Sequence, residues 1–162
     1  MRKLLASLFL IITLGTTQGA YAGPFEDAKA AYSRKDYATA LSLLRPLATQ
    51  GNAEAQVGLG FMYNNGQGVV QDHKEAVKWY RLAAAQGDAK AQYYLGHMYK
   101  NGQGVVQNYV RAHMWYNLSA SIGYSDASKF RDYVATKMTS AQIAQAQELA
   151  QRCQASSYQQ CD

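Results

Sequence analysis

The chain has 162 residues, of which 48% are hydrophobic and 17% are charged, and this composition fits one globular domain and argues against a disordered chain. The formal net charge is +5, but apart from Arg2 and Lys3 the cations are scattered from Lys29 to Arg152 and form no single run. A scattered basic excess gives little support to a nucleic-acid or anionic-membrane partner, so we expect neither.

The first 22 residues have the pattern of a cleaved signal peptide. Arg2 and Lys3 precede an apolar run over residues 4–14, and residues 20–22 read Ala-Tyr-Ala, the small-x-small form that signal peptidase cuts. Cleavage before Gly23 removes two cations and leaves a net charge of +3. The apolar run is too short for a permanent membrane span, since a helix of that length rises only about 16 Å. We therefore expect a periplasmic or secreted protein without stable membrane insertion after cleavage.

The two cysteines, Cys153 and Cys161, fit an oxidising compartment. An even count in an exported chain permits one disulfide with no thiol left over, and this bridge would close a short loop near the C-terminus. Two free thiols are the alternative. Zinc ligation would need further ligands at a spacing that the sequence does not show.

Residues 51–86 and 87–122 form an internal repeat, because 20 of their 36 aligned positions are identical. A match of this kind at a fixed period indicates tandem structural units. Each unit is predicted to hold two helices, since a polar N-cap residue stands before each helix and a glycine after it. The expected N-caps are Asn52 and Asp88 for the first helices and Asp72 and Asn108 for the second, and the expected closing glycines are Gly66, Gly102, Gly87 and Gly123.

The shared pattern A-x-A-Q-x-x-L-G-x-M-Y-x-x-G-x-G-V, followed by A-x-x-W-Y-x-x-A-A and a closing glycine, resembles the Sel-one-like repeat (SLR) family. This family is related to the tetratricopeptide repeat. The resemblance implies an all-α fold, namely a right-handed α/α superhelical solenoid of three to four antiparallel helix pairs.

The segments on either side of the two full repeats resemble atypical helix pairs of the same kind. Residues 23–50 lack the G-x-G-V loop and carry Pro46 within the second helix, which predicts that this helix is kinked or shortened. Residues 123–153 are predicted to form a C-terminal capping pair, with a T-x-x-Q capping box at Thr139, and residues 154–162 a tail.

Apolar residues at helical spacing predict the core of each unit. Gly60 and Gly96 stand in the middle of the first helices, where glycine costs about 1 kcal/mol relative to alanine. This placement predicts that a neighbouring helix needs the space. The expected core residues are Ala55, Leu59, Met62, Tyr63, Ala76, Trp79, Tyr80 and Ala84 in the first repeat and Ala91, Leu95, Met98 and Tyr99 in the second.

A second stripe on the first helices consists of positions that differ between the two copies. In tetratricopeptide-like solenoids the first helices line the concave surface, so the resemblance implies that this stripe faces a ligand-binding groove. Exposed aromatic side chains there can act as binding hot spots, and the lysines favour an acidic partner. The alternative is that the stripe only faces solvent, or that its tyrosines pack on the preceding repeat. The candidate protein-binding residues are Phe61, Lys90, Tyr93, Tyr94, His97 and Lys100.

The sequence holds no common catalytic motif, and its histidines show no metal-binding spacing. We expect no enzyme, no catalytic residue, no cofactor and no metal. The SLR resemblance implies an exported scaffold or adaptor for an unidentified protein or peptide, in envelope signalling, secretion or host interaction.

Two other functions stay open. One is a weak β-lactam-binding or hydrolysing protein, because Cys153-x7-Cys161 resembles the C-x7-C pairs of cysteine-rich exported SLR proteins. Here, however, the pair lies in a tail and no serine nucleophile motif accompanies it. The other is a structural subunit of an envelope complex.

Overall fold

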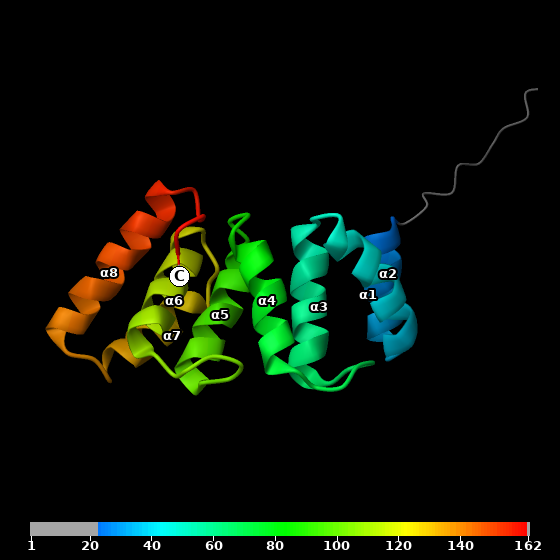
Figure 1. Cartoon of the computed structure of the whole chain (residues 1–162), viewed down its shortest axis with the longest axis horizontal. Helices are drawn as coiled ribbons and strands as arrows, with labels where there is room; N and C mark the ends of the chain where they lie inside the picture. The colour runs from blue at the N-terminus through cyan, green and yellow to red at the C-terminus, as the bar shows by residue number, and fades with distance from the viewer. Residues whose placement is uncertain (1–22, 162) are drawn as a thin grey trace, which may run out of the picture.

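The structure is a computed structural model that describes residues 23–161, so the predicted signal peptide at 1–22 lies outside the described residues. The described chain consists of eight α-helices and contains no strand. The helices stand side by side in one row (Figure 1). They are α1 Pro24–Ser33, α2 Tyr37–Thr49, α3 Ala53–Asn65, α4 His73–Ala84, α5 Ala89–Asn101, α6 Tyr109–Ser121, α7 Ala127–Ala135 and α8 Ser140–Ala155.

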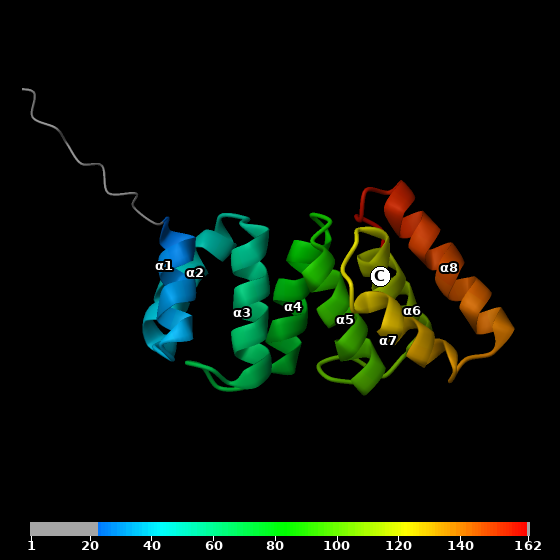
Figure 2. The ribbon, with the colours of Figure 1, turned by 180° about the vertical axis from the view of Figure 1, so that it is seen from behind.

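Helices that are consecutive in sequence pack together, and the resulting pairs stack along the row. Helix α1 packs on α2, α3 on α4 and α5 on α6, while α2 contacts α3 and α4 contacts α5. At the C-terminal end both α7 and α8 pack on α6. Seen from behind, α1 and α7 lie in front of α2 and α6, so these two helices share one side of the row (Figure 2). The predicted all-α solenoid is confirmed.

Side-chain caps and left-handed glycines set the helix ends where the sequence predicts them. The side chains of Asn52 and Asp88 accept hydrogen bonds from backbone N–H groups in the first turns of α3 and α5, at 2.8 and 2.7 Å. Gly66 and Gly102, with φ of 65° and 67°, end the same helices in the left-handed conformation that glycine adopts at little cost. The capping box at Thr139 is also formed.

Pro46 does not shorten α2, which runs on to Thr49, so of the predicted kink or shortening the shortening does not occur. Leu44 and Ala48, on either side of the proline, are buried in the cluster that joins α1, α2 and α3. Burial of these neighbours stabilises the last turn of α2 although the proline has no backbone N–H to donate.

The core follows the predicted stripes. Ala55, Leu59 and Met62 are fully buried in an N-terminal cluster with α1 and α2, and Ala91, Leu95 and Met98 lie in a larger cluster that continues to α8. Tyr63 and Trp79 are only partly buried, at the edges of these clusters.

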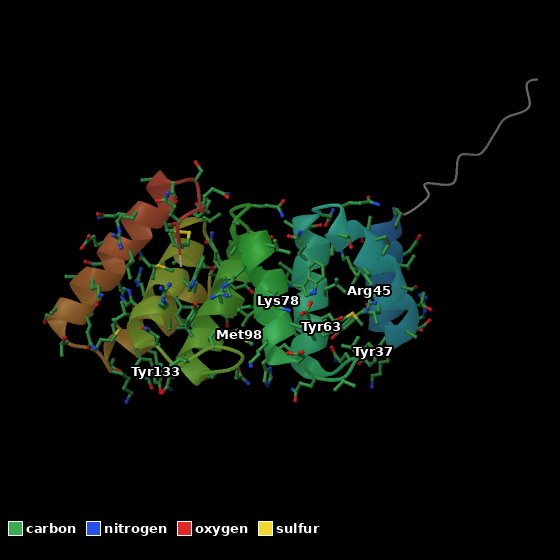
Figure 3. The ribbon with its side chains drawn as sticks, in the orientation of Figure 1. Tyr37, Arg45, Tyr63, Lys78, Met98 and Tyr133 are labelled. Carbon is green, nitrogen blue, oxygen red and sulfur yellow. A yellow bond between two sulfur atoms is a disulfide. The ribbon has the colours of Figure 1, made fainter. Side chains whose placement is uncertain are left out.

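The stacking of pairs is reinforced by a hydrogen bond that recurs with the repeat. Arg45 donates through Nη2 to the hydroxyl of Tyr63 at 3.4 Å, and both side chains are labelled in Figure 3. One repeat later, Arg81 donates to the hydroxyl of Tyr99 at 2.8 Å. Each bond joins a second helix to the first helix of the next pair, so the contacts between pairs repeat as regularly as the sequence does.

Candidate functional site: an aromatic groove

A groove runs along the first helices α1, α3 and α5, with a cavity volume of about 730 Å³. This volume lies within the range of about 300 to 1,000 Å³ that is usual for ligand sites. Apolar side chains make up most of its lining. The lining residues are Phe25, Ala28, Lys29, Tyr32, Ser33, Leu44, Glu54, Val57, Gly58, Phe61, Asp88, Ala89, Lys90, Tyr94 and Tyr124.

Aromatic rings form a continuous row along this groove. The ring centroids of Tyr32 and Phe61 are 6.2 Å apart, and those of Phe61 and Tyr94 are 5.8 Å apart. Tyr93 adjoins Tyr94 at 5.7 Å. These separations are typical of favourable edge-to-face or tilted ring pairs, so the row is held by its own contacts and presents a preformed apolar surface.

Helix α7 and the loop before it cover the C-terminal part of the row. Tyr93 contacts Tyr124 at 4.8 Å and Phe130 at 5.6 Å between ring centroids. His97 contacts Phe130 at 4.6 Å. A smaller cavity of about 380 Å³ remains beside these rings, with Tyr93, His97 and Tyr124 in its lining. The open part of the groove is therefore the part over α1, α3 and the N-terminal half of α5.

Burial keeps the aromatic row uncharged. Loss of hydration lowers the pKa of His97 to about 4, with a smaller contribution from the nearby Lys100 charge. Burial also raises the pKa of Tyr94 to about 12 and raises the pKa of Tyr93. The imidazole and both phenols are therefore neutral at physiological pH.

The charges of the groove come from four side chains at its rim. Lys29 is paired with Glu26 at 3.0 Å, and the carboxylate of Asp88 is used as the N-cap of α5. Glu54 and Lys90 are exposed and lie at equivalent positions, one repeat apart. The rim therefore carries as many carboxylates as ammonium groups.

The structure divides the predicted binding residues into two sets. Phe61, Lys90 and Tyr94 line the open groove. Tyr93 and His97 line the smaller cavity and pack against α7.

Lys100 and Tyr94 also have contacts within the fold. Lys100 lines neither cavity and places its Nζ 5.3 Å from the ring centroid of Phe130. Tyr94 also stacks on Tyr80 of the preceding repeat at 5.0 Å, the packing that the alternative interpretation expected.

Comparison of the two full repeats does not reach two aromatic residues of the site: Phe25, which lines the groove, and Phe130 of α7, which packs on Tyr93 and His97. Phe25 precedes Phe61 by 36 residues, and Phe130 follows Tyr94 by 36 residues. Extending the repeat register in both directions would have found them. Tyr32 has no aromatic equivalent in the next repeat, where Gly68 occupies that position, so the register gives no signal for it.

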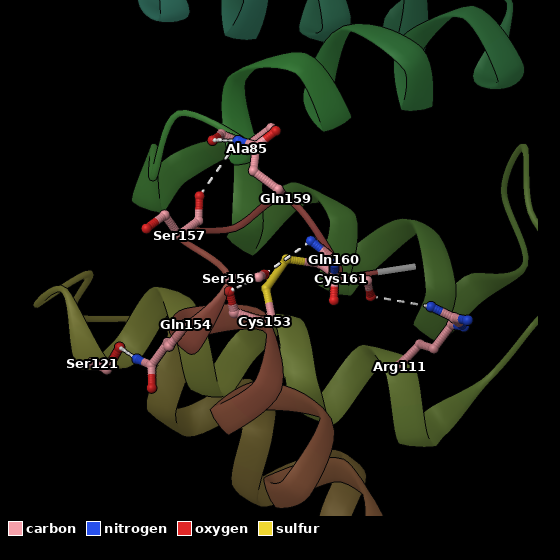
Figure 4. The surroundings of a disulfide bond; sticks show 10 residues. All are labelled: Ala85, Arg111, Ser121, Cys153, Gln154, Ser156, Ser157, Gln159, Gln160 and Cys161. Carbon is pink, nitrogen blue, oxygen red and sulfur yellow. Dashed lines mark hydrogen bonds between the residues drawn. A yellow bond between two sulfur atoms is a disulfide. The ribbon is translucent and has the colours of Figure 1, made fainter.

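Cys153 and Cys161 form a disulfide in the structure, with their Cα atoms 4.6 Å apart (Figure 4). The bridge holds the tail against the repeats. Gln159 donates through Nε2 to the Ala85 carbonyl at 3.1 Å, and Arg111 donates through Nη1 to the Cys161 carbonyl at 3.3 Å. None of the described tail residues lines the groove.

Between residues 23 and 161, no group of three or more His, Cys, Asp and Glu side chains gathers as metal ligands would. No helix in the same part of the chain combines the length and the apolar character that a membrane crossing requires.

Fold and groove together define a helical-repeat solenoid with an apolar surface along its first helices. The family model of the Sel1 repeat matches three segments, residues 29–52, 53–88 and 89–124, which make up more than half of the sequence. The chain belongs to the Sel1 repeat family. Proteins of this family are generally scaffolds for protein interaction.

Solved structures show the same fold. The crystal structure of c5321, a protective antigen present in uropathogenic Escherichia coli strains and displaying an SLR fold, matches with a TM-score of 0.78 at 27% identity. The match covers 83% of this chain but only 31% of that protein. A Sel1 repeat protein from Oxalobacter formigenes matches with a TM-score of 0.61 at 35% identity, over 67% of this chain and 85% of its own. Comparison with curated protein sequences gave no match.

Proposed function

We propose that this protein is an exported scaffold that binds another protein or a peptide in the open groove over α1, α3 and α5. The observation that carries the proposal is the row of aromatic rings from Tyr32 through Phe61 to Tyr94, which lines an apolar cavity on the first helices. Aromatic side chains of this kind dominate the binding energy of many protein interfaces, at about 2 kcal/mol or more for each hot spot.

The exposed Lys90 at the rim supports a role in orienting the partner. A charge at the rim of an interface changes the association rate and the choice of partner more than it changes the affinity. The apolar lining of the groove then supplies most of the affinity, and the charges at the rim affect the association rate and the choice of partner.

Export is part of the same proposal. It is supported by the signal-peptide pattern over residues 1–22 and by the disulfide between Cys153 and Cys161, a bond that persists mainly in oxidising compartments. Fractionation of the source cell with mass analysis tests it. A periplasmic or extracellular product that begins at Gly23 supports export, and a cytoplasmic product that retains Met1 contradicts it.

Groove binding is tested by capture with crosslinking from an envelope extract, using the mature protein and two variants as baits. Phe61→Ala removes one ring of the row, and Leu82→Ala removes an exposed side chain of comparable size from α4 as the matched control. We expect the parent and Leu82→Ala to retain the same partner, and Phe61→Ala to bind it about thirtyfold more weakly. Equal retention by two baits of unchanged helicity would contradict the groove assignment.

A further inference from the structure

Two junctions between helix pairs contain the same stacked ring pair. Tyr80 of α4 stacks on Tyr94 of α5, with centroids 5.0 Å apart and planes at 24°. One repeat later, Tyr116 of α6 stacks on Phe130 of α7 at 5.7 Å and 27°. In each case a second helix supplies one ring and the first helix of the next pair supplies the other, so the stack is a regular feature of the repeat.

The first junction has no such stack. The positions 36 residues before Tyr80 and Tyr94 are Leu44 in α2 and Gly58 in α3. Gly58 carries no side chain, and a Cβ built on it would lie 3.1 Å from Cδ1 of Leu44. Both residues line the open groove. The groove thus extends over Gly58, and the equivalent positions at the other two junctions carry the aromatic rings of Tyr94 and Phe130.

The surroundings of this position suit an uncharged ring. Tyr32, Phe61 and Tyr94 line the groove around it, while Leu44 and Gly58 contribute an apolar surface. The charged side chains that line the groove are two lysines and two carboxylates, so the lining carries no net charge. A site without a net charge does not select an ionic group, whereas its aromatic walls favour offset or edge-to-face contact with another ring.

We propose that the pocket over Gly58 binds a neutral aromatic side chain, phenylalanine or tyrosine, projecting from the partner polypeptide. The inserted ring takes at the first junction the place that Tyr94 and Phe130 hold at the other two, and it packs there on the Leu44 side chain instead of on a tyrosine. This inference rests on the proposed function and narrows it. The partner is a polypeptide that presents an aromatic side chain to α1 and α3.

The test is titration of the 15N-labelled mature protein with N-acetyl-phenylalanine amide, followed through the backbone amide signals. We expect saturable shifts at Gly58 and Phe61. We expect binding about fivefold tighter than that of N-acetyl-leucine amide, because ring pairs add free energy beyond the area that they bury. N-acetyl-alanine amide is expected to cause no saturable shift. Equal binding of the leucine and phenylalanine probes would overturn the aromatic assignment, and the absence of saturable shifts at Gly58 would overturn the pocket.

Two variants locate the site. Gly58→Tyr supplies the missing ring from the chain itself and is expected to abolish the shifts. Gly58→Ala fills less of the space and preserves the fold more readily, and it is expected to weaken binding about threefold. Val106→Ala, at a distant exposed position, is the control and is expected to bind as the parent does. Unchanged binding by Gly58→Ala and by a folded Gly58→Tyr would overturn the proposal.

Failure of this inference is distinguishable from failure of the proposed function. If capture depends on Phe61 but the phenylalanine probe does not bind, the scaffold proposal stands and the aromatic pocket is wrong. If the probe binds over Gly58 but capture does not depend on Phe61, the pocket stands and the partner docks elsewhere.

Discussion

Gly60 in α3 lies directly against the ring of Tyr80 in α4. A Cβ at this glycine would lie 2.6 Å from Cε1 of the ring, well inside van der Waals contact. Gly96 and Tyr116 repeat the relationship one unit later, again at 2.6 Å. Both tyrosines are fully buried, so neither ring has free space to move into. The prediction that these glycines make room for a neighbouring helix is confirmed.

Replacing Gly60 by alanine is therefore expected to destabilise the protein although alanine is the better helix former. Overpacking against the Tyr80 ring should exceed the gain in helix propensity and lower the free energy of unfolding by about 2 kcal/mol. Urea unfolding followed by circular dichroism measures the loss. Gly58→Ala in the same helix is the matched control, because its Cβ would meet only the flexible end of Leu44. Equal stability of the two variants would show that the Tyr80 ring is not the constraint.

The stability of the protein should fall between pH 6.5 and pH 4 because of His97. Its pKa is lowered to about 4 in the folded state, by burial first and by the Lys100 charge second. The unfolded chain, with a histidine pKa of about 6.5, binds the proton more readily in this window, so acidification favours unfolding. We expect a loss of about 1 to 2 kcal/mol from this residue, which is less than the full shift implies because the ring is only partly buried.

His97→Phe is the variant that isolates this contribution. It keeps an aromatic ring against Phe130 and removes the titrating group, so the difference in urea stability between pH 7 and pH 4.5 should shrink by about 1 kcal/mol. His113 has its pKa lowered by burial as well and adds a loss of the same sign, so part of the pH dependence should remain. A pH dependence identical to that of the parent would rule out His97 as a source.

Phe130→Ala should uncover His97 and raise its pKa from about 4 towards 6.5, because the Phe130 ring is 4.6 Å from the imidazole between centroids. The loss of a half-buried ring should also cost about 2 kcal/mol of stability. An NMR titration of the imidazole Cε1 proton measures the pKa. Tyr133→Phe, at an exposed position on the same helix, is the control, because it keeps the ring that Lys100 lies over and should leave the pKa unchanged. An unchanged pKa in Phe130→Ala would mean that α7 does not shield His97.

The helices and their ends were predictable because the signals for them are local. Asn52, Asp88, Gly66 and Gly102 act within one turn of the helix that they delimit, and the core stripe repeats at helical spacing. The extent of α2 was not predictable in this way. The penalty of Pro46 is local, whereas the burial that opposes it comes from helices on both sides.

The candidate site was only partly predictable for the same kind of reason. Comparing the two repeats identified Phe61, Lys90 and Tyr94 as groove residues, since these positions differ on one helical face. Helix α7 covers Tyr93 and His97 because of the way this capping helix packs on the last repeat. A comparison of the two full repeats contains no information about that packing. The 36-residue spacing does extend from Tyr94 to Phe130, which lies outside the two full repeats. The sequence therefore contained part of the evidence for the role of Phe130.

Loss of the disulfide should release the tail and leave the repeats folded. The bridge closes a loop of about nine residues, for which the chain-entropy model gives a stabilisation of about 2 to 3 kcal/mol. Replacing both Cys153 and Cys161 by serine should lower the free energy of unfolding by up to that amount. It should also speed hydrogen exchange at residues 156–161, whose contacts to Ala85 and Arg111 depend on the closed loop.

The double serine variant and the reduced parent serve as controls for one another, because both lack the bridge and should unfold at the same urea concentration. Alkylation with and without reductant, followed by mass analysis, counts the thiols in the parent. Two modified cysteines without reductant would contradict the disulfide. Equal unfolding midpoints for the oxidised and reduced proteins would show instead that the bridge forms but contributes nothing to stability. In that case the contacts of the tail with the ends of α4 and α6 would be enough to hold it.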